Sequence, residues 1–451
     1  MSRIVSKFGG TSLADAGQMR KVAQIVRSDA RRKIVVPSAP GKRVSDEPKI
    51  TDLLYLCYDT VSMQADSSGP FNTIRERYLG IEKELGLAPR MAEELERFRV
   101  QLSQGPTRDF VASRGEYLNG LIVAALLDAV FIDPADYVLI RSNGSVDPKT
   151  YERLGAAIAD PNRMYVIPGF YGSDSHGRIK TFSRGGSDIS GAIAARAANA
   201  ELYENWTDVS GLLMADPRIV KNPSPMIEVT YREIRELSYM GAAVFHDEAI
   251  LPVREAGIPI CIKNTNDPSA PGTSIVTQLS PEVDKSTEIA GIAGKKGFSM
   301  VCLEKSLMNK EVGFAYRLLG VFERRGISVE HCPSSIDGMN VIVDAVQLGE
   351  QSDSVIDEIR RTLEPDRVEI EADLALIAVV GEGMAKSVGI AAKVFAALRD
   401  AGVNVRVINQ GASELNIIVG VAPSDFETAL RALYAAFITS GRLSEGPNRA
   451  A

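Results

Sequence analysis

The C-terminal part of the chain contains an internal repeat, which limits the folds open to it. Residues 312–343 match residues 388–419 without a gap, at a constant offset of 76 residues (388 minus 312). Each copy opens with Val-Gly, continues with apolar residues at spacings of three and four, and reaches a glycine, Gly326 or Gly402, which predicts a helix and its end. Two alternating segments then predict two strands in each copy. We therefore expect this part of the chain to fold as one unit built twice.

Each copy of the repeat predicts a small two-layer fold. An additional strand precedes the helix, so the expected strands are 298–303, 327–330 and 339–343 in the first copy and 374–380, 403–406 and 415–419 in the second. A helix at 355–363 extends the first copy to the order strand, helix, strand, strand, helix. The pattern leaves open whether the pair is a packing module without a ligand or a pair of binding modules.

The composition is that of a globular protein without a general affinity for nucleic acid. A length of 451 residues predicts about three domains with a large buried core. The formal net charge of -7 argues against a nucleic-acid partner, because such binding depends on excess Lys and Arg to neutralise phosphates. The four cysteines and three histidines are scattered, so we expect no disulfide framework and no metal site made by the protein alone.

The sequence shows no evident targeting or membrane-spanning segment. Its first residues already read as a strand, at 4–8, and no apolar stretch approaches the ~20 residues needed to cross a bilayer. Isolated cysteines fit a reducing compartment. Together these features predict a cytoplasmic protein without a membrane partner.

Residues 1 to about 280 predict an α/β domain. Apolar runs of strand length alternate with helical patterns, as expected for a mainly parallel sheet with helices on both faces. The clearest strands are 4–8, 33–36, 164–167, 201–206 and 258–263. Residues 264–271 read as a loop near the end of this domain, and residues 281–288 read as a charged linker.

Three glycine-bearing loops follow strands of this domain. The first, Lys-Phe-Gly-Gly-Thr-Ser at 7–12, precedes a helix for which Ser12 with Asp15 offers a cap. The second is 37–42, and the third, 181–188, opens an alanine-rich helix. Glycines at such places let backbone N–H groups approach an anion, while a neighbouring lysine or arginine neutralises its charge. Each loop taken alone also fits a plain turn with a helix cap.

Two further segments carry polar groups that fit a ligand. Glu116 is expected in the first turn of an apolar helix, where it either complements the helix dipole or holds an ammonium group. Residues 207–218 follow the strand that ends at Trp206 and offer hydrogen-bonding groups to a nucleotide base and ribose. For this second segment, a turn-rich connection is the alternative.

Together these motifs resemble the aspartate kinase family over essentially the whole chain. The matches are Lys-Phe-Gly-Gly-Thr-Ser at 7–12, Ser-Arg-Gly-Glu at 113–116, Gly-Phe at 169–170, Ser-Arg-Gly-Gly-Ser-Asp at 183–188 and Trp-Thr-Asp-Val at 206–209. The resemblance implies an α/β amino-acid-kinase fold at 1–285 followed by two ferredoxin-like ACT domains, one at 306–372 and one at 288–305 plus 373–440. It implies transfer of the γ-phosphoryl group of ATP, with Mg²⁺, to the β-carboxylate of L-aspartate. The product would be 4-phospho-L-aspartate, formed in the first step of lysine, threonine and methionine biosynthesis.

The resemblance also implies a role for each motif residue. Lys7 would stabilise charge on the transferring phosphoryl group, and Asp188 would organise the cations of the active site. Arg184 would bind the α-carboxylate of aspartate, and Glu116 its α-ammonium group. The remaining residues of the aspartate pocket would be Ser38, Thr51, Phe170 and Ser187. The nucleotide site would comprise Lys7, Gly9, Gly10, Ser12, Thr207, Asp208, Asp216, Arg218 and Lys263.

The chain departs from the family at two nucleotide positions. Ala243 stands where many members have a lysine that contacts phosphate, and Leu213 stands where a tyrosine often packs near the adenine. Lys263 is expected to supply a compensating charge. One alternative is a glutamate or uridylate kinase relative, which would lack the paired repeats. Another is a catalytically inactive amino-acid sensor, against which stands the retained set of Lys7, Glu116, Arg184 and Asp188.

The repeats predict feedback control by an amino acid, which the resemblance indicates is L-lysine. The helix N-terminus at Val312 and Gly313 offers backbone N–H groups to a carboxylate, and Glu330 offers a carboxylate to an ammonium group. The expected pocket is completed by Met308, Ser334 and Ser335. In similar members of the family such sites lie between ACT domains of two subunits, which implies a homodimer or homotetramer. The alternative is that the repeats only dimerise the protein.

Overall fold

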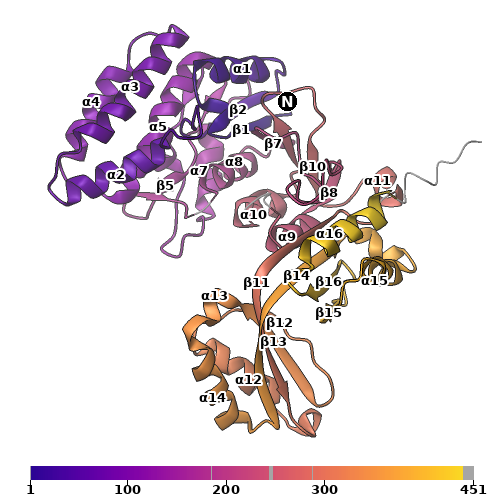
Figure 1. Ribbon diagram of the computed structural model, residues 1–451. Helices are drawn as coiled ribbons and strands as arrows, with labels where there is room; N and C mark the ends of the chain where they lie inside the picture. Colours follow the sequence, from indigo (N-terminus) through magenta and orange to yellow (C-terminus); the bar gives the residue numbers. More distant parts are fainter. Residues whose placement is uncertain (1, 184, 243–246, 287, 440–451) are drawn as a thin grey trace, which may run out of the picture. The chain divides into compact units, whose positions relative to one another are not determined.

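The computed structural model describes residues 2–183, 185–242, 247–286 and 288–439 (Figure 1). The chain divides into two compact units. The first contains Met1–Leu212, Met226–Tyr231 and Val244–Leu279, and the second contains Leu213–Pro225, Arg232–Ala243 and Ser280–Ala451. The first unit contains an eight-stranded sheet and a large hydrophobic core, and the second contains a six-stranded sheet with two hydrophobic cores.

The first unit is built on a mainly parallel sheet, as predicted. In the described residues its strand order is β3-β4-β2-β1-β7-β9-β10-β8. The bounds are β1 Ile4–Phe8, β2 Arg32–Pro37, β3 Val130–Phe131, β4 Tyr165–Val166, β7 Leu202–Thr207, β8 Glu228–Thr230, β9 Ile260–Asn264 and β10 Thr273–Val276. The pairings are parallel except that of β9 with β10. The central strand β1 is buried along its whole length between β2 and β7.

Helices cover both faces of this sheet. Successive side chains of a strand point to opposite faces, so each face presents side chains to a layer of helices. Phe8 and Trp206 stack on one face, with ring centroids 5.9 Å apart, in the core that the N-terminal helices complete. Those helices are α1 Ala16–Arg27, α2 Ile50–Ser62, α3 Ser68–Leu85, α4 Met91–Leu102 and α5 Arg108–Leu127 (Figure 1). Lys7 and Asn205 lie on the other face, together with α8 Gly186–Ala197. Packed against α8 are α7 Lys149–Ala157 and α10 Asp247–Ala256.

The first glycine loop leads into α1, whose cap differs from the one expected. Met19, Val22, Ala23 and Val26 are buried, as the periodicity predicts. The N-cap is Asp15, whose carboxylate accepts a hydrogen bond of 2.9 Å from the backbone N–H of Gln18. The expectation that Ser12 helps to cap this helix is wrong, because Ser12 belongs to a separate short 3-10 turn, Thr11–Leu13.

Among the described helices, α5 alone is long and apolar enough to cross a membrane by length and composition. Its most apolar window is 78% buried inside the protein, against the other helices and strands of the first unit. We therefore assign α5 to the core of this unit.

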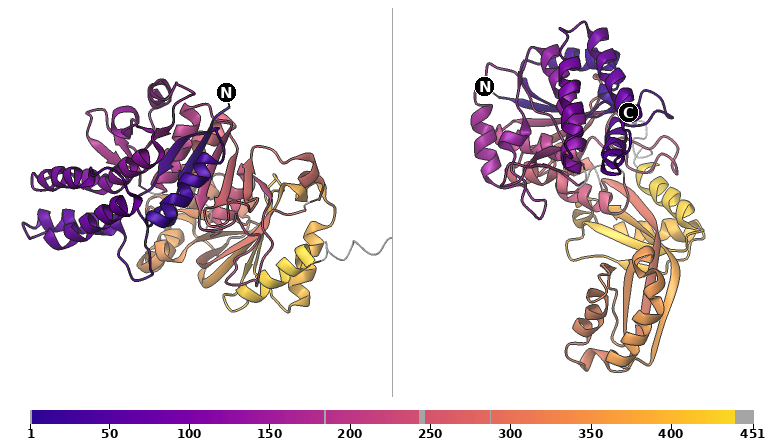
Figure 2. Two further views of the ribbon diagram at one scale, coloured as in Figure 1. Left: turned by 90° about the horizontal axis from the view of Figure 1, so that it is seen from above. Right: turned by 90° about the vertical axis from the view of Figure 1, so that its left-hand side faces the viewer.

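The second unit is built on an antiparallel sheet in the order β12-β13-β11-β14-β16-β15. Two strands of 14 residues, β11 Gly291–Glu304 and β14 Arg367–Val380, run side by side through both repeats (Figures 1 and 2). The shorter strands are β12 Val329–His331, β13 Gly338–Asp344, β15 Val407–Asn409 and β16 Asn416–Val421. The main helices are α12 Phe314–Glu323, α14 Ser352–Leu363, α15 Ile390–Asp400 and α16 Phe426–Tyr434.

The long strands share their residues between two hydrophobic cores. Val301 and Leu303 belong to the core of the first repeat, whereas Ile289 and Ile292 belong to the core of the second. The segment that the family resemblance assigns to the second repeat, 288–305, thus contributes residues to both cores. The exact division of residues 288–440 into two nested domains stays a prediction. The expected charged linker contains a short helix, α11 Pro281–Ser286.

The first short strand of each repeat begins later than expected, because the preceding helix closes with a glycine motif. Gly326 and Gly402 adopt left-handed backbone angles, with φ of 66° and 69°. The backbone N–H of Ile327 then donates back to Phe322, and that of Val403 to Leu398. The residues after each glycine are thus still engaged by the helix end, and pairing starts only in β12 and β15.

These two glycines give a test of the repeat. Gly326→Ala and Gly402→Ala should each cost about 1–2 kcal/mol, because alanine meets no neighbouring atom there but is strained at positive φ. Gly320→Ala, inside α12, should be neutral or stabilising, because glycine lowers helix stability and the added methyl meets only the flexible end of Arg324. Unfolding followed by circular dichroism measures all three. Equal losses at positions 320 and 326 would contradict the capping role.

Candidate active site

The site is centred on Lys7, a lysine that is only 7% exposed at the carboxyl end of β1. Its Nζ lies 2.5 Å from Oδ1 of Asp188, which stands in the first turn of α8. Asn205 completes the group, because its Nδ2 donates to the same Asp188 oxygen at 2.9 Å while its Oδ1 accepts from Lys7 at 3.4 Å. Lys7, Asp188 and Asn205 form what we call the polar triad. It lies at the carboxyl edge of parallel strands, where α/β sheets bind ligands.

Asn205 is the member of the polar triad that sequence reasoning missed. It lies one residue before the matched motif at 206–209. The parallel pairing of β1 with β7 sets Lys7 directly beside Asn205, so both side chains point to the same face. Asn205 could have been found only from the register of two strands about 200 residues apart. A local sequence motif does not contain this information.

The first two glycine loops are packed backbone against backbone. The N–H of Gly41 donates to the carbonyl oxygen of Gly10 at 2.8 Å, and a Cβ on Gly41 would lie 2.5 Å from the carbonyl carbon of Gly10. Only glycine fits such an approach. The N–H of Gly9 donates to Trp206, and the hydroxyl of Ser12 shares a 2.7 Å hydrogen bond with Thr265. The structure thus brings loops 7–12 and 37–42 together at the end of β1.

Glu116 is a buried carboxylate in the middle of α5. This helix begins at Arg108 with Thr107 as its cap, so the expectation of Glu116 in the first turn is wrong. The side chain lies among buried residues, 6% exposed, and its Oε2 has no hydrogen-bond partner in the described part of the chain. Burial raises the pKa of Glu116 to about 7, against the opposing effect of a backbone hydrogen bond from Ala39. Within the described residues this oxygen is therefore available to a ligand that donates a hydrogen bond.

One turn further along α5, Asn119 holds the second glycine loop. Its Nδ2 donates to the carbonyl oxygen of Ser38 at 2.6 Å, and the N–H of Ser38 donates to Phe8 at 3.1 Å. These contacts place Ser38 between β1 and the helix that carries Glu116. Thr51 is half-buried in the first turn of α2, which follows this loop.

The segment at 169–170 is packed tightly against the start of α8. Phe170 has a φ of 80°, a left-handed value that is unusual for a bulky residue and marks a constrained position. A Cβ on Gly186 would lie 2.2 Å from the Phe170 ring, and one on Gly169 would lie 2.7 Å from Cβ of Ser187. Phe170, Ser187 and Asp188 are thus held together. Arg184 and Ala243 lie outside the described residues.

Lys263, one of the residues proposed for the nucleotide, does not face the polar triad. Lys263 lies in register with Trp206 and stacks on its ring at 5.4 Å, on the opposite face of the sheet from Lys7. The hydroxyl of Thr207 donates to Asp208 at 3.2 Å just beyond β7. Leu213, Asp216 and Arg218 belong to the second unit. Arg218 forms an ion pair with Asp216, with a nitrogen–oxygen distance of 2.6 Å.

The six proposed effector residues do not share one pocket within the chain. Ser334 and Ser335 line a pocket of about 530 Å³ with Lys305, Ser306, Asp337 and Asp366 among others. Met308 is buried in the core of the first repeat, while Val312 is 93% exposed beside Gly313, the N-cap of α12. Glu330 accepts a hydrogen bond from the Tyr239 hydroxyl, and burial raises its pKa.

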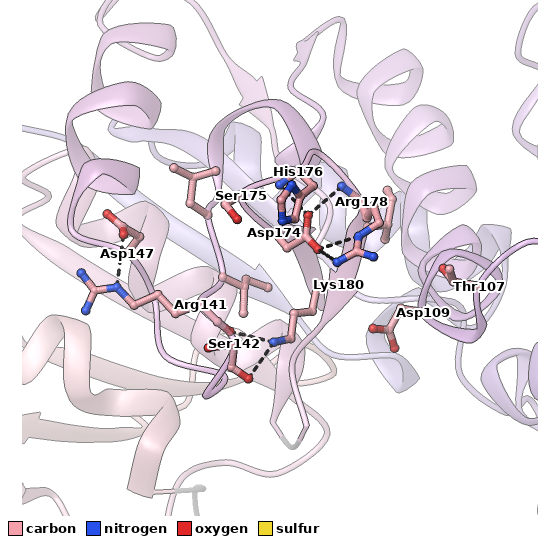
Figure 3. A pocket seen from close by; sticks show the side chains of 13 residues that line it. Thr107, Asp109, Arg141, Ser142, Asp147, Asp174, Ser175, His176, Arg178 and Lys180 are labelled. Carbon is pink, nitrogen blue, oxygen red and sulfur yellow. Dashed lines mark hydrogen bonds and ion pairs between the residues drawn. The ribbon is translucent and has the colours of Figure 1, made fainter.

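A pocket of about 670 Å³ lies elsewhere in the first unit, against the hairpin of β5 Tyr171–Ser173 and β6 Ile179–Thr181 (Figure 3). Its arginine and lysine side chains already interact with other residues of the protein. Arg141 pairs with Asp147 at 3.1 Å, Arg178 pairs with Asp174 at 2.7 Å, and Lys180 donates to backbone carbonyl groups. We therefore do not assign a charged ligand to it.

The described residues contain no group of three or more His, Cys, Asp or Glu side chains that is placed to hold a metal ion. The carboxylate of Asp188 at the polar triad fits a different arrangement. Mg²⁺ is usually held by one or two carboxylates together with the phosphates of a nucleotide, and it keeps several water ligands. The donor set is thus compatible with Mg²⁺ that arrives with a nucleotide.

Comparison with known proteins identifies the families to which the two parts of the chain are similar. Residues 2–264 match the amino acid kinase family, and residues 377–437 match an ACT domain. The chain is 40% identical to aspartokinase 3 of Bacillus subtilis (strain 168), over 98% of this chain and 100% of that protein.

Solved structures of the same kind are also similar to the chain. Aspartate kinase of Clostridium acetobutylicum is 48% identical, with a TM-score of 0.88 over 97% of this chain and 99% of that one. Escherichia coli aspartokinase III is 27% identical. Its complex with aspartate and ADP has a TM-score of 0.73 over 96% of this chain and 99% of that one. Its complex with lysine and aspartate has a TM-score of 0.72 over 97% and 99%.

Glu116→Gln tests the buried carboxylate without any assay of activity. Its pKa is about 7 in the folded protein and 4.5 as a reference, so the folded state binds more protons between these values and wild-type stability falls as pH rises from about 4.5 to 7. The glutamine variant lacks this loss. We expect its melting temperature, relative to wild type, to increase from pH 5 to pH 8.

The matched control is Glu94→Gln on α4. Glu94 is equally buried but lies 3.4 Å from Arg90 and 3.2 Å from Arg97, so its replacement should destabilise the protein. A melting-temperature difference for Glu116→Gln that stays constant from pH 5 to pH 8 would mean that Glu116 does not titrate in this range.

Proposed function

The chain belongs to the aspartokinases of the amino acid kinase family, and from this premise we propose how its residues carry out the reaction. It is an ATP-dependent aspartate kinase with an α/β amino-acid-kinase domain and a C-terminal ACT region. We propose that it transfers the γ-phosphoryl group to the β-carboxylate of L-aspartate and forms 4-phospho-L-aspartate. The observations that carry this proposal are the polar triad around the buried Lys7 and the buried Glu116 carboxylate, whose Oε2 has no hydrogen-bond partner among the described residues.

The polar triad serves the phosphoryl group in this proposal. The acceptor carboxylate is itself the nucleophile, so the protein needs to position two substrates and to neutralise charge. Lys7 has its ammonium group fixed by Asp188 and Asn205 before any substrate binds, which lowers the cost of reorganisation during the reaction. Asp188 is the carboxylate that would hold Mg²⁺, which when bound supplies positive charge to the phosphate oxygens.

Glu116 serves the amino end of aspartate. An α-ammonium group placed against Oε2 would pair the buried charge and lower the pKa of Glu116 from about 7. Arg184 remains our proposal for the α-carboxylate, on the family motif alone. The pocket between these two groups is proposed to include Ser38, Thr51, Phe170 and Ser187.

The nucleotide contacts are proposed in two groups, one for the phosphates and one for the base and ribose. Gly10 and Ser12 in the first loop, with Gly9, are proposed for the phosphates, and Thr207 with Asp208 for the base and ribose. Asp216 and Arg218 are proposed for the same site from the family motif. Lys263 is proposed for the nucleotide rather than for the transferred phosphoryl group, because its side chain stacks on Trp206.

We also propose that L-lysine inhibits the enzyme through the ACT region. The enzyme is proposed to be a homodimer or a homotetramer. The similar Escherichia coli aspartokinase III has been solved with lysine and aspartate in a T-state, and with aspartate and ADP in an R-state. In this chain Glu330 is proposed for the effector's ammonium group, with Met308, Val312, Gly313, Ser334 and Ser335 in the same site. Because the chain alone does not gather these residues, the proposal requires a second subunit.

Lys7→Ala and Asp188→Ala test the phosphoryl end. Each should lower kcat by at least ~100-fold, or about 2.7 kcal/mol of transition-state stabilisation, because each removes charge placed at the transferring group. A coupled assay of aspartate-dependent ADP release measures this. Lys83→Ala, at an exposed position of α3, should leave kcat unchanged. Turnover near wild type in either triad variant would remove that residue from the catalytic group.

Titration with lysine and with threonine tests the effector. A coupling free energy of about 1–3 kcal/mol would change the apparent substrate affinity roughly 5- to 150-fold. Glu330→Ala should abolish the response to lysine. Tyr239→Phe is the matched control, because it removes the hydrogen bond to Glu330 but keeps the carboxylate. Loss of the response in both variants would assign the effect to the Tyr239 contact, and no response of wild type to lysine would overturn the choice of effector.

A further inference from the structure

We propose that Arg77, on α3 and outside every matched motif, is a positioning residue that fixes the two glycine loops of the kinase site in their working geometry. The inference rests on the proposed function, because it concerns the loops assigned there to aspartate and ATP. Arg77 is 8% exposed and points into the junction of three segments that carry proposed site residues.

The guanidinium of Arg77 binds each of these segments. Its Nη2 donates to the carbonyl oxygens of Ala14 and Gly41, both at 2.7 Å, and its Nη1 donates to the carboxylate of Glu47. Ala14 ends the turn that follows the first glycine loop, and Gly41 lies in the second loop. Glu47 stands three residues before α2, whose first turn contains Thr51. One rigid, planar cation thus ties both loops to the start of α2.

The contact that Arg77 supports is a close backbone approach between the two loops. Gly41 donates to Gly10 at 2.8 Å, with no room for a Cβ between them. A shift of Gly41 therefore moves the first loop, which begins at Lys7, and the second, which begins near Ser38. Catalytic groups must be held within about 0.5 Å of their productive positions by such supporting residues.

Glu47 also binds Arg43, the residue that directly follows the second loop. Its carboxylate accepts from the backbone N–H of Arg43 at 2.7 Å and from the Arg43 Nε at 3.0 Å. The hydrogen bonds from Arg43, and then the one from Arg77, lower the pKa of Glu47 to about 2. The carboxylate is therefore charged at neutral pH, and the loop needs no ligand to take this shape.

Two observations separate Arg77 from an ordinary buried ion pair. Its Nε has no partner among the described residues, and its other two nitrogens donate to three different segments. Arg32 and Glu204 form such an ordinary pair in the same domain, at 2.8 Å, between β2 and β7. The hydrogen bonds of Arg32 go to Glu204, Ile25 and Ser28, and none of these lies in a glycine loop.

The experiment compares Arg77→Lys with Arg32→Lys in the full chain. Each variant keeps the charge and loses the two-pronged donor, so both should lose some thermal stability. Arg77→Lys should raise KM for aspartate at least ~10-fold and lower kcat about 10-fold, because a misplacement of about 1 Å at such a site can cost roughly 100-fold. Arg32→Lys should keep both constants within about twofold of wild type.

Chemical rescue supplies a second readout that a structural role would not give. A pocket of about 220 Å³ opens beside Arg77 and is lined by acidic residues that include Glu47, Glu76 and Glu84. Guanidinium ion at millimolar concentration should therefore enter the space left by Arg77→Ala and lower its KM for aspartate at least ~3-fold. Sodium chloride and urea at the same concentration should not. If Arg77→Ala does not fold, Glu47→Gln replaces it as the second variant, with a raised KM expected.

The outcomes separate this inference from the proposed function. Wild-type KM and kcat in Arg77→Lys would overturn the positioning role while leaving the kinase assignment intact. Equal kinetic losses in Arg77→Lys and Arg32→Lys would overturn it too, because the effect would then follow general destabilisation. Wild-type protein without aspartate-dependent ADP release would overturn the proposed function and, with it, this inference.

Discussion

The buried ammonium group of Lys7 is the constraint on which the rest of the kinase domain depends. A charge at the centre of a sheet is costly unless it is paired and hydrogen-bonded. Asp188 and Asn205 supply these contacts, and they come from α8 and β7, on one face of the sheet. The register of β1 with β7 and the position of α8 are therefore tied to the same requirement. The opposite face carries the apolar core around Phe8 and Trp206, so charge and core are separated by the alternation of a strand.

Close packing fixes the segments around this charge centre. A Cβ atom on Gly41 would clash with Gly10, and one on Gly186 would clash with Phe170. These close contacts fix the positions of the loops. The strained φ of Phe170 shows that the surrounding packing determines its conformation. Glu116 approaches the same region from α5 with an unpaired oxygen. In the proposed function, a positive group on the substrate pairs with this oxygen, and the polar triad serves the transferred phosphoryl group.

The ACT region depends on a different constraint, the pair of long strands β11 and β14. Because each strand contributes to both hydrophobic cores, neither repeat is a structurally independent domain. The two copies share a continuous antiparallel sheet, and a change in the twist of one is expected to reach the other through these strands. Such an element suits a regulatory region, in which binding at one place must be felt elsewhere.

The sequence by itself determined the class of each domain, because periodicity and glycine placement are local properties. Strands 4–8 and 201–206, the glycine loops and the repeat with Gly326 and Gly402 are all visible in the chain and present in the structure. Long-range contacts decided the rest. Asn205 joins Lys7 across 198 residues through strand register, and Glu116 lies in the middle of its helix rather than in the first turn. Arg77 acts on loops 36 and 63 residues away, and no local pattern marks it. Local propensity predicts elements, whereas register and packing decide which side chains share a site.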